Sequence, residues 1–177
     1  MRSKYWEAIV QEMEKFAKDD RVLFIGQQCA SEDFYNTLKT ISTEKRYEMP
    51  VAEEMQMGIC IGLAFEGFLP ISIYQRMDFL PRAADQLVNH LSICKRMTQG
   101  MFNPKVIIRT TVGTNDPFDV GLQHNKDLSE GFQYLVDFPI IRVKTVQEVH
   151  EAYEVARMSD GPTMIVEYQE LYNVQGN

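Results

Sequence analysis

The sequence predicts an α/β protein with three α/β/α layers, in which helices cover both faces of a mainly parallel β-sheet. Two observations lead to this fold class. Short apolar runs without polar alternation are typical of strands buried on both faces. These runs alternate along the chain with stretches of helical periodicity, as in βαβ units. The 177 residues contain no internal repeat or linker, and this length suffices for one full core, so we expect a single domain over residues 1–177.

The N-terminal part of the chain begins with an amphipathic helix, followed by strands and a long polar segment. The helix is expected over residues 3–17, with Ser3 as its cap and Glu12 among its solvated residues. Residues 27–46 are polar and irregular, with a short helix expected around Phe34–Leu38. The strands expected in this part are Val22–Gly26, Arg46–Met49 and Leu69–Tyr74.

The second half of the chain continues the alternation of strands and helices. Pro81 is expected to start a long helix, roughly 82–98, because proline suits the first helical turn. The buried stripe of this helix would comprise Ala84, Leu87, Val88, Leu91 and Cys94. Thr145 caps the last helix and forms a capping box with Glu148. The other expected elements are strands Lys105–Thr110, Ile140–Val143 and Thr163–Glu167, a polar loop at 111–127, and helices near Ser129–Leu135 and Val146–Met158.

Composition narrows the class of protein. Hydrophobic residues make up 45% and charged residues 24% of the chain, as in soluble globular proteins. The formal net charge of -7 argues against nucleic-acid binding. The longest apolar run, Met57–Phe65, is too short to span a bilayer. The N-terminus has no signal-peptide core, and Cys29, Cys60 and Cys94 are expected to be reduced thiols, so we expect a cytoplasmic protein without membrane contact.

The common local signatures of catalysis and cofactor binding are absent from the sequence. Gly26 follows a strand, but no Gly-x-Gly-x-x-Gly motif surrounds it, and no Walker-type Gly-Lys-Ser/Thr occurs. No Gly-x-Ser-x-Gly elbow is present. The histidines, cysteines and acids show no local metal-ligand spacing. The chain therefore contains no self-contained phosphate or metal site that the sequence reveals.

The stretch Glu48–Leu69 offers the strongest candidate site. After Pro50 the pattern becomes helical, and Gly67 ends the helix. This helix is almost wholly apolar, so we expect it to be buried, yet it begins with Glu53 and Glu54. Acids in a first turn are favoured by the helix dipole. One of the two must nevertheless lie in or beside an apolar interior, which is costly without a partner.

The same stretch, with several later ones, resembles the pyrimidine-binding domain of thiamine-diphosphate enzymes. The closest resemblance is to the beta chains of 2-oxo acid dehydrogenases, in the transketolase superfamily. It covers nearly the whole chain, in order and with similar spacings. The residues that carry it are Pro50–Met55, Gly58-Ile-Cys-Ile-Gly62, Gly67–Pro70, Phe79, Ala84-Asp85-Gln86, Asn89, Val106–Arg109, Gln123-His124, Pro162–Glu167 and Leu171-Tyr172.

The resemblance implies a role for three residues. Glu53 matches the glutamate that hydrogen-bonds a ring nitrogen of the aminopyrimidine, which promotes the imino tautomer and formation of the cofactor ylide. Apolar surroundings favour the protonated form of a carboxyl that such a role requires. Phe79 matches the aromatic residue that packs on the pyrimidine ring. His124 matches a loop histidine that faces the substrate. Glu54, where the family usually has an apolar residue, would face solvent or a partner.

Simpler interpretations exist for each of these residues. A first-turn acid such as Glu53 is usually stabilised by backbone N–H groups alone. Phe79 could be an ordinary core aromatic, and His124 a surface-loop histidine beside Asn125 and Lys126. Without the resemblance we would favour this simpler interpretation of Glu53; with it we favour the cofactor role.

Departures from the family pattern bear on cofactor and partners. The family loop Arg-Gly-Pro-x-Gly is replaced by Arg109-Thr-Thr-Val-Gly113, which affects substrate and ion contacts. The Gly-Asp-Gly…Asn signature for magnesium and the diphosphate is missing, and we expect the C-terminal domain of the dehydrogenase beta chains to be missing as well. The resemblance therefore implies a partner subunit that carries this signature and binds magnesium. The Gly58–Gly62 helix is expected to mediate self-association, with a heterotetramer as the assembly.

The function implied is that of a beta-like subunit of a split thiamine-diphosphate enzyme. Such an enzyme cleaves a carbon–carbon bond next to a carbonyl in a 2-oxo acid or ketose-like donor and transfers or releases the fragment. It could be dehydrogenase-like, passing an acyl group to a lipoyl carrier, or transketolase-like or decarboxylase-like. The alternative from another class is a non-catalytic interaction or regulatory module derived from a pyrimidine domain.

Overall fold

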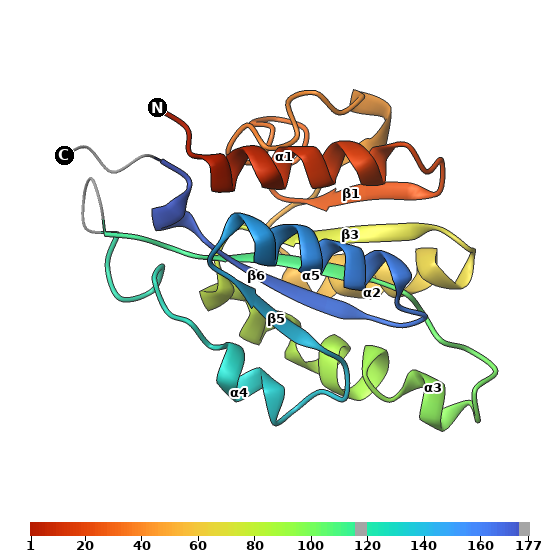
Figure 1. Ribbon diagram of the computed structural model, residues 1–177. Coiled ribbons are helices and arrows are strands. Elements are labelled where there is room, and N and C mark those ends of the chain that lie inside the picture. Colours follow the sequence, from red (N-terminus) through yellow and green to blue (C-terminus); the bar gives the residue numbers. More distant parts are fainter. Residues whose placement is uncertain (116–119, 174–177) are drawn as a thin grey trace.

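A computed structural model describes residues 1–115 and 120–173 of the chain. Its centre is a six-stranded sheet in which every neighbouring pair of strands is parallel (Figure 1). The strand order is β2-β1-β3-β4-β6-β5. The strands are β1 (Val22–Gly26), β2 (Arg46–Glu48), β3 (Leu69–Tyr74), β4 (Ile107–Val112), β5 (Ile140–Val143) and β6 (Thr163–Tyr168). The mainly parallel sheet predicted from the apolar runs is thus confirmed.

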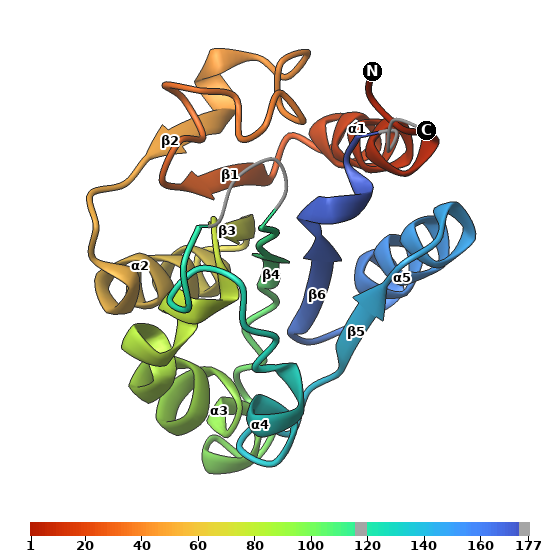
Figure 2. The ribbon, with the colours of Figure 1, turned by 90° about the vertical axis from the view of Figure 1, so that its left-hand side faces the viewer.

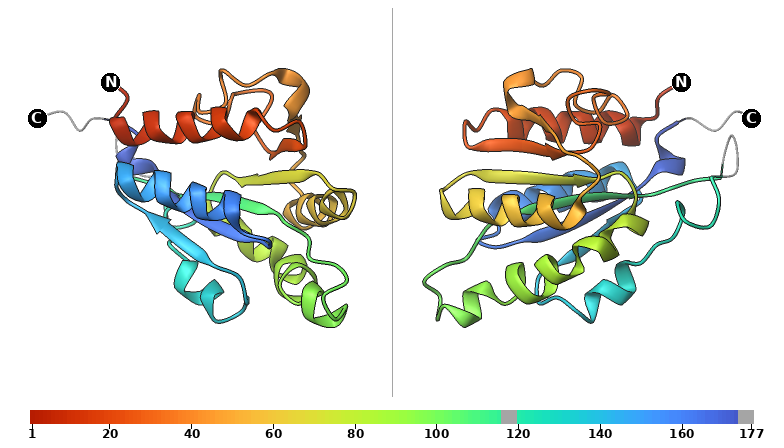
Figure 3. Two further views of the ribbon diagram at one scale, coloured as in Figure 1. Left: turned by 45° about the vertical axis from the view of Figure 1, so that its right-hand side comes forward. Right: turned by 180° about the vertical axis from the view of Figure 1, so that it is seen from behind.

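Helices cover both faces of this sheet, which gives the predicted three α/β/α layers (Figure 2). One face is covered by α1 (Lys4–Ala17) and α5 (Val146–Met158), which lie side by side. The other face carries α2 (Glu53–Phe65) and the segment that runs through 77–97, as the view from behind shows (Figure 3). The segment 77–97 ends with α3 (Cys94–Met97). Other short helical elements are α4 (Ser129–Gln133) and the 3₁₀ turns η1 (Thr43–Lys45) and η4 (Gln169–Leu171).

Each face of the sheet has its own apolar core. Phe16 of α1 and Tyr153 of α5 pack with Phe24 of β1 on one side. Met57 of α2 packs with Ile108 of β4 and neighbouring residues on the other. Successive residues of a strand point to opposite faces of the sheet and pack alternately into the two cores. Because both faces are covered, the strands are continuous apolar runs.

The ends of the longest helices follow the sequence signals. In α1 the hydroxyl of Ser3 accepts a hydrogen bond from the backbone N–H of Trp6. In α5 Thr145 and Glu148 form the reciprocal capping box that their spacing predicts. Gly67, just beyond α2, has a φ of +86°, a left-handed conformation that glycine adopts without steric cost.

The segment 82–98 is helical in pieces, but the prediction of one long continuous helix is wrong. The chain instead forms a 3₁₀ segment η2 (Met77–Ala83) that contains Pro81, a π-helical segment η3 (Gln86–Leu91) and the single turn α3. In the π segment the N–H of Ser92 donates to the carbonyl of Leu87, five residues back. The wider turn rotates the expected stripe, so that Leu87 and Leu91 are buried whereas Ala84, Val88 and Cys94 are only half-buried.

The short helix expected around Phe34–Leu38 is replaced by a left-handed turn. Asp33, Phe34, Tyr35 and Asn36 all have positive φ, of 54°, 40°, 55° and 62°. Phe34 and Leu38, four residues apart in the sequence, are both fully buried. That spacing places two side chains on one face in a turn of either hand, so periodicity alone could not reveal the handedness.

Glu12 of α1 is buried rather than solvated, because α5 packs over it. Its carboxylate forms ion pairs with Lys15, at 2.5 Å, and with Arg157 of α5, at 2.9 Å. The ring Nδ1 of His150 lies 2.6 Å from the same carboxylate. Burial opposes ionisation, but the hydrogen bonds from Lys15, His150 and Arg157 outweigh it and lower the pKa of the Glu12 carboxyl.

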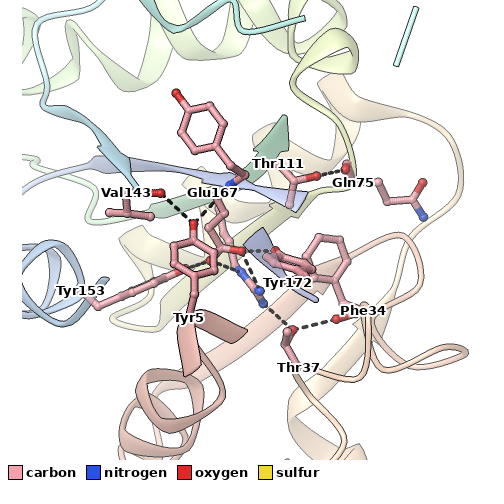
Figure 4. Close-up of polar contacts among 11 residues, drawn as sticks. Tyr5, Phe34, Thr37, Gln75, Thr111, Val143, Tyr153, Glu167 and Tyr172 are labelled. Atoms are coloured by element: carbon pink, nitrogen blue, oxygen red, sulfur yellow. Dashed lines mark hydrogen bonds and ion pairs between the residues drawn. The ribbon is translucent and has the colours of Figure 1, made fainter. Parts of the chain in front are cut away.

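A buried ion pair joins Arg109 of β4 to Glu167 of β6, and a hydrogen bond from Arg109 extends the network to Thr37 in the loop after β1 (Figure 4). Arg109 donates from Nε and Nη2 to the carboxylate of Glu167, at 2.8 and 3.0 Å, and from Nη1 to the hydroxyl of Thr37. Tyr153 and Tyr172 point toward Glu167 and donate their hydroxyl protons to it. This network fixes the position of the loop that leads from β1 toward the candidate site.

Two further structural observations concern the described part of the chain. No helix within 1–115 or 120–173 combines the length and apolar character needed to cross a membrane. All three cysteines are free thiols, and those of Cys29 and Cys60 are fully buried. Burial raises the pKa of the Cys60 thiol to about 12, so this sulfur is a core group rather than a nucleophile.

Candidate functional site

The carboxyl edge of the sheet gathers side chains from four separate segments around one cavity of about 570 Å³. Such an edge is where open parallel sheets bind ligands, and the volume is within the usual range for small-molecule sites. The cavity is lined by a flat aromatic ring, by three amide side chains and by acids and cations. The lining includes Gln27, Glu53, Asp78, Phe79, Arg82 and Gln123.

Glu53 is the first residue of α2, and its side chain is only 2% exposed. Its carboxylate accepts hydrogen bonds from Gln27 Nε2, at 3.4 Å, and from Arg82 Nε, at 3.0 Å. Ala52 precedes it and offers no side-chain cap. The structure therefore places one of the two acids at the edge of the interior, as the sequence predicted, while Glu54 faces outward and is exposed.

Gln56, one turn along α2, holds the start of this helix against the sheet. Its side-chain Nε2 lies 3.3 Å from the carbonyl of Ile25 in β1, and 3.1 and 2.9 Å from Ser72 Oγ and the carbonyl of Ile73 in β3. The side chain is fully enclosed, so its amide must be bonded inside the protein. Sequence reasoning missed Gln56; its signal was a single amide in an otherwise apolar helix.

Phe79 and His124 are brought together by the segments that follow β3 and β4. Their ring centroids are 5.7 Å apart and the rings are perpendicular, an edge-to-face contact. Asp78 accepts a hydrogen bond from the N–H of Lys126, which ties the two segments together. At Gly113 any larger residue would collide with the carbonyl of His124, so glycine allows the close approach of the loop.

The three residues singled out from the sequence are not equally placed in the cavity. Glu53 and Phe79 both line it. His124 packs on Phe79, but it is the neighbouring Gln123 that reaches the lining. The His124 ring nitrogen Nδ1 is buried and has no hydrogen-bond partner among the residues described.

Tyr35 connects the loop after β1 to the segment that follows β3. The hydroxyl of Tyr35 accepts a hydrogen bond from Arg76, which follows β3, and the Arg76 guanidinium lies over the Tyr35 ring at 5.4 Å. Burial lowers the pKa of Arg76 from its ordinary value. The left-handed turn thus positions an aromatic side chain against the segment that carries Asp78 and Phe79.

The outer face of α2 is open, which corrects the expectation that this helix is buried all round. Met55 and Ile59 are 46% and 42% exposed, and Val51 before the helix is more exposed still. With Gly58 and Gln86 they border a second cavity, of about 690 Å³, on the other side of Glu53. An apolar pattern predicts that a face is covered but cannot distinguish the protein's own core from a partner.

Within the described residues, no group of three or more His, Cys, Asp or Glu side chains is arranged to hold a metal ion. The cationic partner of Glu53, Arg82, was also missed from the sequence. It lies 29 residues from Glu53, and nothing in the local pattern around either residue indicates their pairing.

Comparisons with known proteins agree with this architecture. The chain is 26% identical over 168 residues to the pyruvate dehydrogenase E1 component subunit beta of Cyanidium caldarium, covering 92% of this chain and 51% of that protein. It is 29% identical over 171 residues to the 3-methyl-2-oxobutanoate dehydrogenase subunit beta of Mycobacterium tuberculosis, covering 90% of this chain and 47% of the relative. The chain thus spans about half the length of these curated relatives.

A solved structure described as a split gene transketolase, inactive beta4 tetramer, has the same fold. The TM-score is 0.66 at 17% sequence identity, over 94% of this chain and 50% of the other. The family model described as "Transketolase, pyrimidine binding domain" matches residues 1–175. Because that match spans nearly the whole sequence, the chain belongs to the family of transketolase pyrimidine-binding domains.

Proposed function

We propose that the chain is the pyrimidine-binding, beta-like part of a thiamine-diphosphate-dependent enzyme. The reaction would cleave a carbon–carbon bond next to a carbonyl in a 2-oxo acid or ketose-like donor. Membership of the transketolase pyrimidine-binding family supports this class, as do relatives named as beta subunits of 2-oxo acid dehydrogenases. The observation that carries the proposal is the placement of Glu53 and Phe79 on one cavity at the carboxyl edge of the sheet.

The residues around this cavity fit an aminopyrimidine ring. Such a ring is flat and apolar on its faces, and its edge presents nitrogen atoms that hydrogen-bond. Phe79 offers a flat face, and the enclosed carboxylate of Glu53 offers one strong hydrogen-bonding group at the cavity wall. The hydrogen bonds from Gln56 to Ser72 and Ile73 of β3 hold the start of α2 against the sheet, and so fix the position of the Glu53 carboxylate.

The cofactor, when bound, supplies a nucleophilic carbon that attacks the donor carbonyl. Glu53 would share a proton with a ring nitrogen through its carboxyl oxygen, a task suited to a carboxyl largely shielded from water. Phe79 would orient the ring by packing against its face. His124, held edge-on to Phe79, would exchange a proton with the substrate oxygen.

A partner would hold the other end of the cofactor. We propose that a second subunit with a Gly-Asp-Gly…Asn motif binds the diphosphate and magnesium. Support comes from the relatives, which are named as beta subunits, and from the tetrameric split transketolase that shares the fold.

Replacing Glu53 tests the catalytic assignment. Glu53→Gln keeps the shape of the side chain but removes its ionisable proton, so turnover of the assembled enzyme should fall by about 10²-fold or more. Glu54→Gln is the matched control, because Glu54 is adjacent in sequence but exposed. Size-exclusion chromatography should show intact assembly for both variants.

Two outcomes would contradict the proposal. Near wild-type turnover of Glu53→Gln would show that Glu53 has no catalytic role. Calorimetry in which the wild-type assembly binds no thiamine diphosphate in the presence of magnesium would favour the non-catalytic interaction module instead.

A further inference from the structure

Arg82 pairs with the Glu53 carboxylate from the solvent side. Its Nε lies 3.0 Å from Glu53 Oε2, while Gln27 occupies the other oxygen. The two partners differ sharply in environment, since the Glu53 side chain is 2% exposed and that of Arg82 is 69% exposed. Arg82 belongs to the lining of both cavities that flank Glu53.

This ion pair serves the protein in the absence of a ligand. A carboxylate shielded from water is costly unless hydrogen bonds or a countercharge compensate it. Gln27 supplies only a long, neutral contact, of 3.4 Å. Arg82 therefore provides the main compensation for Glu53 among the residues described, and it does so from the solvent side.

The same ion pair conflicts with the proposed task of Glu53. A guanidinium has only donors and remains charged, so it favours an ionised carboxylate and occupies a lone pair of the oxygen that it faces. A ring nitrogen that shares a proton with Glu53 needs access to a carboxyl oxygen. Arg82 and the ring of a cofactor therefore compete for one group.

We propose that Arg82 is a displaceable cap on Glu53, which neutralises the carboxylate in the free protein and moves away when the pyrimidine ring binds. This inference rests on the proposed function. The geometry allows the movement, because Arg82 is a long side chain mostly in solvent. Its side chain makes no other hydrogen bond or ion pair to the residues that the structure describes. Arg82 is thus a positioning residue that sets how readily the site accepts its ligand.

If Arg82 is such a cap, its replacement should lower the stability of the ligand-free chain but raise the affinity of the assembled enzyme for thiamine diphosphate. Arg82→Gln leaves Glu53 uncompensated, so the urea midpoint of the full chain without ligand should fall. In the assembled enzyme the same variant should bind thiamine diphosphate about two- to tenfold more tightly, because no ion pair has to break. A side chain needed only for folding, or one that contacts the ligand, would weaken binding rather than strengthen it.

Two further variants sharpen the test. Arg96→Gln is the matched control, because Arg96 is 72% exposed and pairs with Asp137 at 3.0 Å beside a different cavity. It should leave the affinity for thiamine diphosphate unchanged. Arg82→Lys retains the charge without the Nε donor and should fall between wild type and Arg82→Gln. In a Glu53→Gln background, Arg82→Gln should no longer change either the urea midpoint or the affinity.

The outcomes separate this inference from the function on which it rests. Unchanged or weaker binding by Arg82→Gln, in an assembly whose wild type binds thiamine diphosphate normally, would overturn the cap and leave the proposed function intact. An equal effect of Arg82→Gln in the Glu53→Gln background would also overturn it. If the wild-type assembly binds no thiamine diphosphate, both the proposed function and the proposed role of Arg82 are wrong.

Discussion

Arg109 and Glu167 are both fully enclosed, and their pairing shows how single residues stabilise this fold. Burial opposes the charge of Arg109, but the Glu167 carboxylate outweighs it, so the pKa of the guanidinium is raised. Burial, together with the charge of Glu167, raises the pKa of Tyr153 and Tyr172, which therefore stay protonated and donate to Glu167. Glu167 thus accepts four hydrogen bonds inside the protein, two from Arg109 and two from the tyrosine hydroxyls.

Removing one member of this pair should be far more costly than a surface substitution. Arg109→Leu leaves the Glu167 carboxylate buried without its countercharge, so the free energy of unfolding should fall by about 3–5 kcal/mol. Urea titration followed by circular dichroism measures the loss. The double variant Arg109→Leu/Glu167→Leu should lose less than the sum of the two single variants. Strict additivity would show that the two charges do not stabilise each other.

At the scale of residues, the sequence revealed side chains whose role depends on local pattern. Glu53 was recognisable because an acid at the head of an apolar helix is unusual, and because a family motif surrounds it. Gln56 and Arg82 were not, because their contacts depend on where β3 and η2 lie in three dimensions. The burial of Glu12 was missed for the same reason, since α5 covers it from 138 residues away in sequence.

The start of the loop after β1 is held by hydrogen bonds to a single carboxylate, that of Glu48. Glu48, at the end of β2, accepts hydrogen bonds from the backbone N–H groups of Gln28, Ala30 and Ser31, at 2.6, 2.9 and 3.1 Å. Partial burial opposes its ionisation, but these three N–H groups outweigh it and lower the pKa of the Glu48 carboxyl. The ionised form of Glu48 therefore favours the folded loop.

The sign of this pKa shift predicts how the loop responds to acid. Because the pKa is lower in the folded state, the stabilisation is complete above about pH 4.3, the ordinary value for glutamate, and is lost as the pH falls through the folded pKa. In an NMR titration the amide proton shifts of Gln28, Ala30 and Ser31 should change together, with a midpoint below about 4.3.

Glu48→Gln provides the control for this titration. The variant should abolish the common midpoint and reduce the protection of the three amides from hydrogen exchange. A midpoint at or above the ordinary glutamate value would show that the backbone contacts do not favour the carboxylate.

At the scale of elements, the sequence predicted those whose signals are local. The capping box of α5 and the apolar runs of the strands depend on residues a few positions apart, and the structure confirms them. The continuous α-helix predicted over 82–98 was wrong in type, because a π-helical turn hydrogen-bonds five residues back instead of four and the apolar spacing does not distinguish the two. The left-handed turn at 33–36 was missed because spacing carries no information on handedness.

At the scale of the whole molecule, the open face of α2 is the most unusual surface. Ile59 borders two cavities, the one beside Glu53 and an apolar one of about 360 Å³ that reaches Tyr47 of β2 and Phe68. A connected apolar face of this kind on a folded protein marks an interaction surface. Gly62 lies on the same helix, and nothing lies within 4 Å of the position that its Cβ would take.

We predict that this face mediates self-association through close approach of two α2 helices. Gly62→Leu should be tolerated by the isolated fold, because the position is open and leucine favours helix more than glycine does. The added side chain would keep a second helix at a distance, so the mass measured by sedimentation equilibrium should shift toward the monomer. Gly131→Leu, at an equally open glycine in α4, is the matched control and should leave the mass unchanged. If Gly62→Leu assembles like wild type, copies of the chain do not meet at this helix, and the apolar face must be covered by a different chain.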